Sequence, residues 1–222
     1  MTFDWKWDFV WEIAPRLAAA TLNTLLAAGS GYAIALVLGL ALALGQRTRW
    51  PALTFILRET LEFIRSTPLV LQIFFIFYVG PQVGITLSPW VAGMMAIGLH
   101  YSAYLAEVYR AGIVAVPKGQ WEACRALNMT TRDTYARIVL PQAVPQAIPG
   151  MGNYLVGIFK DTPMLSVIGV TELMQTANAI GSETYRFLEP YTLVGVIFLA
   201  LSLPTAGLVR LLERVLRRKL GM

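Results

Sequence analysis

Charge is scarce in this chain of 222 residues, because only 14% of them are Asp, Glu, Lys or Arg whereas 56% are hydrophobic. Soluble globular domains carry about 25% charged residues, so this composition excludes an ordinary soluble domain. It indicates a membrane protein, and a chain of this length accommodates several membrane-spanning helices of about 20 residues each. We therefore predict an all-α integral membrane protein.

Cysteine and histidine are each present once, as Cys124 and His100. A single cysteine excludes an internal disulfide, and the two residues together are too few for a zinc ligand set. They also lie on opposite sides of a predicted span, which argues against a nucleophile–base triad. His100 is interpreted as a packed, hydrogen-bonded histidine, with a ligand role as the alternative. We predict no catalytic residue, no metal site and no cofactor.

A phosphate-binding loop is also missing, since no Gly-Lys dipeptide occurs anywhere in the sequence. The Gly-x-x-x-x-Gly-Lys-Ser/Thr loop needs that lysine to hold nucleotide phosphates, so we expect no ATP binding by this route. No signal peptide is evident, because Met1 to Glu12 lacks a basic beginning and mixes acidic residues with Lys6. The tryptophans of this segment suit a membrane–water interface.

Five apolar blocks predict five membrane-spanning helices. Small residues recur every four positions in the first block, and we interpret this stripe (Gly31, Ala35, Gly39 and Ala43) as a packing surface for another helix. Between the fourth and fifth blocks, residues 164–189 alternate apolar and polar side chains, which indicates a short helix and an outer loop. The blocks run approximately over Leu17–Gly45, Ala52–Val79, Pro89–Ile113, Ile138–Ile158 and Pro190–Val209.

The second and third blocks contain ionisable residues. Arg58 and Glu62 are four apart and Glu62 and Arg65 three apart, so ion pairs along one helix face are available. This first half of the second block is expected near the membrane surface or inside a bundle. In the third block, Glu107 and Arg110 can neutralise one another in the same way.

The basic residues predict the orientation in the membrane. With the N-terminus outside, five spans leave eleven Lys and Arg residues inside and four outside, as the positive-inside rule requires. With four or six spans, either the basic residues of the central polar stretch or those of the C-terminal tail would lie outside. The net charge of +5 is thus ascribed to topology, and we predict no nucleic-acid binding. The inside set is Arg47, Arg49, Lys118, Arg125, Arg132, Arg137, Arg210, Arg214, Arg217, Arg218 and Lys219, and the outside set is Lys6, Arg16, Lys160 and Arg186.

The longest polar interruption in the middle of the chain lies between Pro117 and Pro141. It has the pattern of a short amphipathic helix, in which Glu122 and Arg125 share one side. Asn128 tolerates the left-handed conformation that ends a helix. An ordinary polar loop is the alternative. The residues expected to rest on apolar neighbours are Ala123, Ala126 and Leu127.

The residue order within this stretch resembles the signature loop of the membrane subunits of ABC importers. That pattern reads Glu-Ala-Ala, three residues, Gly, nine residues, Ile-x-Leu-Pro, and residues 122–124, 128 and 138–141 follow it. Cys124 replaces an alanine, and Asn128 replaces the glycine. Three further segments resemble polar amino-acid permeases of the same class: residues 65–72, 104–113 and 160–162.

This resemblance covers about Thr21 to the C-terminus and implies a type I ABC importer fold of the MetI-like kind. It implies an extracytoplasmic segment over residues 1–16 and an ABC transmembrane type-1 domain over residues 17–219. A cytoplasmic coupling loop, residues 117–141, would lie between the third and fourth spans. The implied function is a permease of the bacterial cytoplasmic (inner) membrane that translocates a polar amino acid or amino-acid-like solute, including solutes of the ectoine type.

The resemblance also implies partners. They are a second permease subunit, either a copy or a paralogue, an ABC ATPase dimer on the cytoplasmic side, an extracytoplasmic solute-binding protein and the lipid bilayer. The alternative is a stand-alone secondary carrier or channel. Secondary carriers often contain internal repeats, and we recognise no convincing repeat here. A chain of this size is also small for a lone pathway.

Two sets of site residues follow from these considerations. The residues expected to couple to the ATPase are Gly119, Glu122, Ala123, Arg125, Ala126 and Asn128. The candidates for the substrate pathway are Arg65, Tyr104, Glu107, Lys160 and Asp161, because ionisable groups in or near a bilayer are costly and usually have a function. Two alternatives remain open, a structural ion pair for Arg65 and a local ion pair at the outer face for Lys160 with Asp161.

Overall fold

The computed structural model describes residues 4–220, and for residues 217–220 it describes the backbone alone. The first three residues of the expected N-terminal segment and the side chains of Arg217, Arg218 and Lys219 therefore lie outside the described part. Every regular element within it is helical. The main helices are α1 (Trp7–Gly45), α2 (Pro51–Ser66), α3 (Leu69–Phe74), α4 (Pro89–Val114), α5 (Lys118–Ala126), α6 (Thr131–Asp133), α7 (Leu140–Asp161), α8 (Leu173–Thr184) and α9 (Leu188–Leu220).

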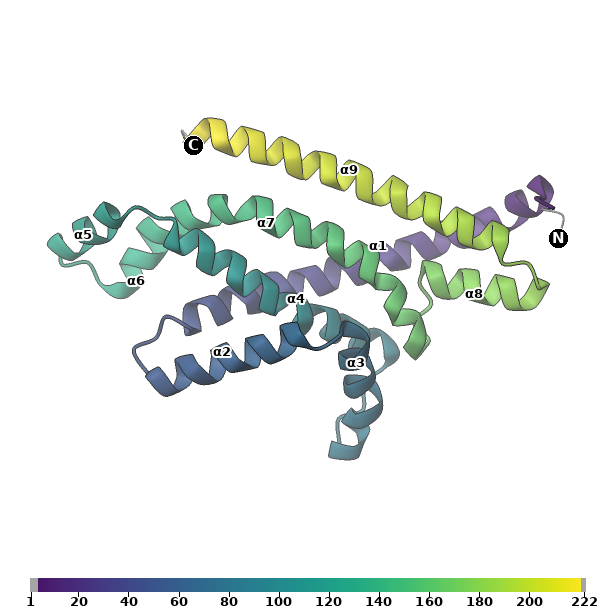
Figure 1. The fold of residues 1–222 in the computed structure, drawn as a ribbon, viewed down its shortest axis with the longest axis horizontal. Helices are drawn as coiled ribbons and strands as arrows, with labels where there is room; N and C mark the ends of the chain where they lie inside the picture. Colours follow the sequence, from purple (N-terminus) through teal and green to yellow (C-terminus); the bar gives the residue numbers. More distant parts are fainter. Residues whose placement is uncertain (1–3, 221–222) are drawn as a thin grey trace.

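The long helices run side by side along the molecule, the short helices α5, α6 and α8 lie at its ends, and the short helix α3 projects from its middle (Figure 1). Helices α5 and α6 form one end, whereas α8 and the N-terminus form the other. Four short segments extend or join the main helices. They are the π-helical segments Phe75–Val79 and Thr134–Val139 and the 3₁₀ segments Gly80–Val83 and Thr162–Ile168.

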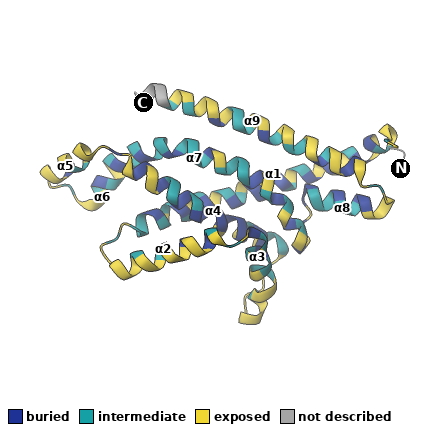
Figure 2. Cartoon of the chain, viewed as in Figure 1, coloured by how far each residue is buried: buried dark blue, intermediate teal, exposed yellow. Residues whose placement is uncertain are grey.

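Close packing between α1 and α4 forms the main core. All four residues of the small-residue stripe on α1 are buried, which confirms its interpretation as a packing surface. A Cβ added at Gly39 would lie 2.9 Å from the Cβ of Leu105 and 3.0 Å from the carbonyl oxygen of Ser102. Small residues thus permit the approach of the two backbones. Figure 2 shows the resulting concentration of buried residues along α4.

The second apolar block is sharply bent. Helices α2 and α3 meet at an angle of 107°, because Pro68 holds the preceding residue in an extended conformation that ends α2. The side chain of Gln72 closes the bend by donating to the carbonyl oxygen of Ile64 (2.8 Å) and to Oγ1 of Thr67 (2.7 Å). Beyond it, α3 and the π-helical segment form an arm that projects from the bundle (Figure 1).

Among the described residues, length and composition identify two helices that can cross a membrane by themselves, α1 and the part of α9 from Leu188 to Leu216. The bent pair of α2 with Leu69–Val83 raises the number to three. Helices α4 and α7 are 26 and 22 residues long, but each contains ionisable residues. The count of five predicted spans therefore goes beyond what length and composition establish.

Helix α1 begins ten residues before the expected start of the first span, at Trp7 rather than Leu17. Its first turns pack in a second core at the α8 end, where Ile13 and Leu17 contact Leu173, Ile180 and Val194. Ion pairs surround this core. Arg16 binds Glu183 at 2.8 Å, and Arg186 pairs with Asp4 and Glu189.

Candidate functional site

Helix α5 has well-defined ends. Pro117 precedes it in an extended conformation. At the other end Asn128 adopts φ 51°, the left-handed conformation predicted from the sequence. Its amide donates to the carbonyl oxygen of Arg125, and the amide of Met129 donates to that of Cys124, both at 3.0 Å. These two bonds form a Schellman motif, which satisfies the final carbonyl groups of the helix and fixes where it stops.

The inner face of α5 is narrow. Cys124 is its one buried residue, and the half-buried ring of Trp121 packs edge-on against Tyr135 with centroids 5.6 Å apart. The expectation that Ala123, Ala126 and Leu127 rest on apolar neighbours is wrong. All three face outward, and Leu127 is 73% exposed, because Trp121 and Cys124 take up the contact with the bundle.

All of the residues expected to couple to an ATPase are consequently exposed. A small core beneath them holds the loop rigidly to the bundle. It consists of Ile113 at the end of α4, Val116 just after α4, Val139 just before α7 and Ala143 in the first turn of α7. Trp121 of α5 packs against this core, so α5 is in contact with the ends of α4 and α7. The exposed set is Gly119, Glu122, Ala123, Arg125, Ala126 and Asn128.

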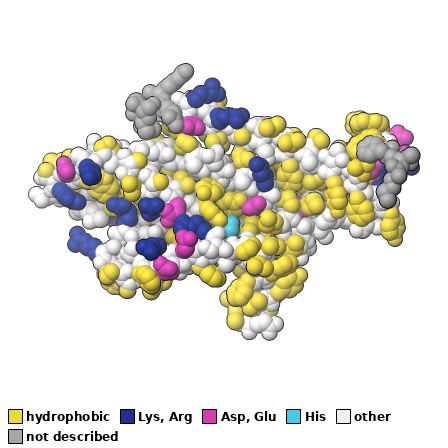
Figure 3. Space-filling view, in the orientation of Figure 1, with side chains coloured by type: hydrophobic (Ala, Val, Ile, Leu, Met, Phe, Trp, Pro, Cys, Tyr) yellow, Lys and Arg dark blue, Asp and Glu magenta, His cyan; other side chains and the backbone are white. Residues whose placement is uncertain are grey.

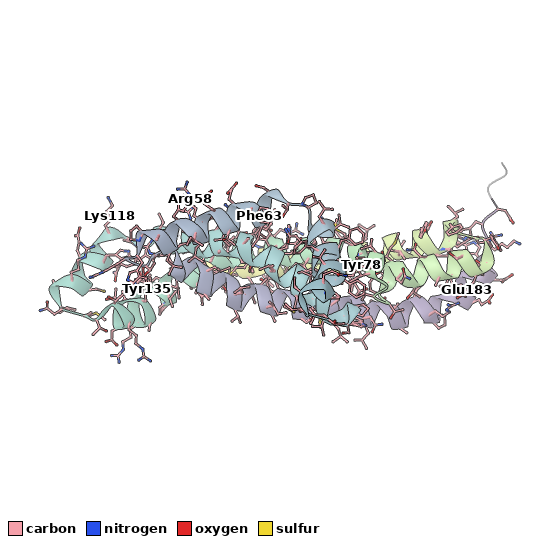
Figure 4. The ribbon with its side chains drawn as sticks, turned by 90° about the horizontal axis from the view of Figure 1, so that it is seen from below. Arg58, Phe63, Tyr78, Lys118, Tyr135 and Glu183 are labelled. Atoms are coloured by element: carbon pink, nitrogen blue, oxygen red, sulfur yellow. The ribbon has the colours of Figure 1, made fainter. Side chains whose placement is uncertain are left out.

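A polar cavity of about 340 Å³ lies beside α5. Arg47, from the turn after α1, forms one wall of it, and its Nε donates to the hydroxyl of Tyr135 at 2.8 Å. The Arg47 guanidinium also lies 5.3 Å from the centre of the Trp121 ring, within cation–π range. Figure 4 shows Lys118 and Tyr135 at this same end of the molecule. The lining residues are Arg47, Lys118, Trp121, Glu122 and Arg125.

A second group of charges joins α2 to α4. Arg65 binds Glu62 on its own helix at 2.6 Å and Glu107 of α4 at 3.1 Å, and Glu107 also binds Arg110 at 2.7 Å. The Glu62–Arg65 and Glu107–Arg110 pairs match the spacing seen in the sequence. Arg58 pairs instead with Glu59 at 3.5 Å. The structure thus brings together two pathway candidates, Arg65 and Glu107, and gives Arg65 a structural ion pair.

Three tyrosine rings lie between this group of charges and Asp161. The Tyr104 hydroxyl donates to the carbonyl oxygen of Arg65 at 3.3 Å, and its ring lies 5.4 Å from that of Tyr154. Tyr101 lies next, 6.1 Å from Tyr154, and its hydroxyl donates to Oδ2 of Asp161 at 2.7 Å. Four of the five pathway candidates therefore lie along one continuous line on α2, α4 and α7.

Lys160 does not join this line. It is exposed and lines a shallow groove against α9 with Phe198 and Leu203. The ion pair between Lys160 and Asp161, one of the two alternatives left open, does not form among the described residues, and Asp161 accepts the Tyr101 hydroxyl instead. His100 is buried, and its Nδ1 lies 3.3 Å from Oε1 of Gln72, as the packed, hydrogen-bonded interpretation predicted.

Several residues of these two groups were missed from the sequence, among them Tyr154, Arg47 and Tyr135. Tyr154 follows a run of prolines and glycines in α7, and no local pattern marked it as the partner of Tyr104. Arg47 was used only as a topology marker, and Tyr135 was read as part of a spacer. Each contact joins segments far apart in the sequence. Arg47 could have been found from its position. It follows the first apolar block, so the predicted topology already placed it on the same side of the membrane as the signature loop.

In the described residues the chain is a helical bundle with an apolar surface, ionisable side chains between its inner helices and an exposed polar helix at one end. This arrangement is typical of an integral membrane protein. Residues 31–218 match the family described as "Binding-protein-dependent transport system inner membrane component", and the chain belongs to this family. It is accordingly a multi-pass inner-membrane permease of an ABC import system.

Curated relatives match over almost their whole length. A probable amino-acid ABC transporter permease protein of Sinorhizobium fredii is 42% identical, with 96% of this chain and 95% of the relative covered. The glutamine transport system permease protein of Escherichia coli K12 is 31% identical, with 96% and 98% covered.

Solved structures give the same result. An amino acid ABC transporter crystallised with histidines matches with a TM-score of 0.87 and 33% identity, covering 96% of this chain and 99% of that one. An inward-facing MetNI methionine ABC transporter matches with a TM-score of 0.70 at 18% identity, covering 96% and 99%, and supports the fold alone.

Proposed function

We propose that this chain forms the transmembrane pathway of an importer for a polar amino acid or amino-acid-like solute, with α5 as its coupling helix. The names of the relatives support the solute class, since they are described as permeases for amino acids or for glutamine. The observation that carries the coupling role is the exposure of all six residues expected to contact the ATPase, on and just after a helix that ends in a left-handed cap. ATP hydrolysis then belongs to a partner subunit.

The proposed topology has five spans with the N-terminus outside. The two termini lie toward opposite ends of the bundle, as an odd number of spans requires (Figure 1). Helices α4 and α7 are long enough to cross, and one ionisable residue of each, Glu107 and Asp161, contacts a neighbouring helix. Ionisable groups within membranes usually face a bundle interior or a cavity, so their presence is compatible with spanning.

Coupling is proposed to work as a rigid lever. The outward face of α5 offers a hydrophobic projection, Leu127, beside the charges of Glu122 and Arg125. A groove on the ATPase would receive this face. When the ATPase subunits close on ATP, α5 moves with them, and the core of Ile113 and Val139 carries the motion into α4 and α7. The spans then alternate between inward- and outward-facing arrangements.

The solute pathway is proposed to follow the line from Arg65 to Asp161. A zwitterionic solute presents a carboxylate and an ammonium group, which match Arg65 and the carboxylates of Glu107 and Asp161. The rings of Tyr104 and Tyr154 between them suit the ammonium group through cation–π contact. These side chains are half-buried in the single chain. We therefore propose a second permease subunit, a copy or a paralogue, that closes the pathway.

The first test is co-purification with the cognate ATPase and solute-binding protein in mild detergent. We expect a complex with two ATPase subunits. Glu122→Arg should lose the ATPase and abolish ATP-driven uptake, because it reverses the charge at the centre of the exposed face. Thr131→Arg is the control, since it adds a cation to the same loop, at an exposed position, without removing Glu122.

Two outcomes would contradict the proposal. One is unchanged uptake in the Glu122→Arg variant with the chain still inserted in the membrane. The other is purification of the wild-type chain free of any ATPase together with solute movement by the chain alone in vesicles. The second outcome would favour a stand-alone carrier.

A further inference from the structure

The polar cavity beside α5 contains charges that remain unpaired within this chain. Arg47, Lys118, Arg125 and Glu122 all line it, yet none of them forms an ion pair with another described residue. Other charges at helix contacts do pair, for example Arg65 with two carboxylates and Arg186 with Asp4 and Glu189. Three cations and one carboxylate give the cavity an excess of two positive charges.

Exposed charges are often simply solvated, but Arg47 is not free in solvent. Its Nε is held by the Tyr135 hydroxyl at 2.8 Å, and its guanidinium lies over the Trp121 ring at 5.3 Å. These two contacts orient the remaining guanidinium nitrogens while leaving them without an acceptor in the described part of the chain. An arginine oriented in this way loses little further side-chain freedom when it binds a carboxylate, which favours binding.

The signs of the charges distinguish between possible occupants. The headgroup of an anionic lipid would place its phosphate against the three cations, but also against the carboxylate of Glu122. A protein surface can present carboxylates to the cations and a cation to Glu122 at the same time. The mixed charge of the cavity therefore fits an acidic protein surface that also carries a basic residue.

We propose that Arg47 is a docking residue for acidic side chains of the ATPase, and that the cavity between α1 and α5 is part of the coupling interface. This inference rests on the proposed function of α5 and extends it to a residue outside the signature loop. Because Arg47 follows directly after α1, the ATPase would act on α1 as well as on α4 and α7. Closure would then pull three helices of the bundle together.

The test measures the affinity of the cognate ATPase for the permease in lipid nanodiscs. Arg47→Glu should lower the affinity at least tenfold and flatten its dependence on salt, because a favourable charge contact becomes a repulsive one. Arg49→Glu is the matched control, with the same charge change at an exposed position two residues away and outside the cavity. It should change the affinity by less than twofold.

A second variant separates orientation from charge. Tyr135→Phe keeps the guanidinium and the aromatic contact with Trp121 but removes the hydroxyl that holds Nε. We expect a loss of about threefold in affinity, with the salt dependence retained. The unfolding temperature of each variant without ATPase shows whether the permease itself is intact.

The outcomes distinguish this inference from the proposed function. Equal affinities for Arg47→Glu and Arg49→Glu, with binding still lost in Glu122→Arg, would overturn the role of Arg47 and leave the coupling role of α5 in place. Unchanged binding in both Arg47→Glu and Glu122→Arg would overturn both. An effect of Arg47→Glu in nanodiscs with phosphatidylglycerol but not in those of phosphatidylcholine alone would assign the cavity to anionic lipid and overturn the inference.

Discussion

Glu172 is fully buried at the start of α8, outside the proposed spans. Its two carboxyl oxygens accept from the amides of Met174 (2.9 Å) and Gln175 (2.7 Å), and the neighbouring Leu173 amide donates to Oγ1 of Thr24 on α1. Burial raises the pKa of Glu172 from 4.5 to about 7, and the two amide donors oppose that shift only in part. The residue therefore titrates near neutral pH at a junction between α1 and α8.

This shift predicts that the contribution of Glu172 to stability is larger in mild acid than in mild base. The native carboxyl keeps its proton to a higher pH than the unfolded one, so protons stabilise the native state. Stability should fall as pH rises from about 4.5 to about 7 and should then level off. The total loss is on the order of 3 kcal/mol. Unfolding in detergent, followed by tryptophan fluorescence at several pH values, measures the change.

Glu172→Gln should remove this pH dependence, because the amide does not titrate. Glu183→Gln is the control on the same helix. The pKa of Glu183 is lowered by its hydrogen bond from Arg16, so its contribution has the opposite sign and is lost as pH falls. A pH profile that Glu172→Gln leaves unchanged would refute the assignment.

At the scale of helices, the contact of α1 with α4 depends on the absence of side chains. We expect Gly39→Ala to destabilise the protein by about 1–3 kcal/mol, because the new Cβ would lie 2.9 Å from that of Leu105 and the backbones would have to separate. Gly29→Ala, on the same helix, meets nothing within 4 Å. Alanine is favoured over glycine in a helix by roughly 0.5–1 kcal/mol, so this control should be neutral or stabilising.

Unfolding midpoints of the two alanine variants in the same detergent provide the comparison. Equal midpoints would mean that the close approach of α1 to α4 is absent in the membrane-extracted protein. A larger residue at position 39, such as leucine, should increase the effect in proportion to its volume.

Local patterns predicted several elements well. The left-handed turn at Asn128 followed from the tolerance of asparagine for positive φ, and the stripe on α1 followed from its four-residue spacing. The 107° bend after α2 was not predicted, since Pro68 marks a break but not its angle. The outward face of α5 was assigned wrongly, because periodicity alone does not say which side meets the bundle.

In the two groups of site residues, contacts within one helix could be predicted from the sequence, whereas contacts between helices could not. Pairs within one helix, such as Glu107 with Arg110, could be read from their spacing. The contact of Arg65 with Glu107 and that of Tyr104 with Tyr154 join different helices. They depend on how α2, α4 and α7 are arranged in space, which no local pattern in the sequence specifies.

At the scale of the whole molecule, the distribution of basic residues changes along the long axis of the helix bundle. On the face shown in Figure 3, most Lys and Arg side chains lie in the half toward α5, whereas much of the other half and the projecting arm are hydrophobic. Helix α1 has 39 residues and thus a length of about 58 Å, against about 30 Å for the hydrocarbon core of a bilayer. It therefore reaches well beyond the hydrocarbon.

The proposed orientation can be tested by labelling single cysteines. In a Cys124→Ala background, Glu12→Cys should react in intact cells with a maleimide that does not cross membranes. Thr131→Cys should react only after permeabilisation, because both positions are exposed but lie at opposite ends of the molecule. Labelling of both from the outside, or the reverse order, would refute an N-terminus outside with the α5 end in the cytoplasm.

The stripe on α1 also has a consequence for synthesis. The chain is made from the N-terminus, so α1 leaves the ribosome before α4 exists. Until then Gly31 and Gly39 face lipid rather than the residues they later contact, Ile97 and Leu105. Helix α1 must therefore remain in the bilayer as an independent segment, which its apolar composition allows. When α4 later packs against α1, it displaces lipid from the shallow groove along this stripe. The helices are therefore expected to assemble in the order in which they are synthesised.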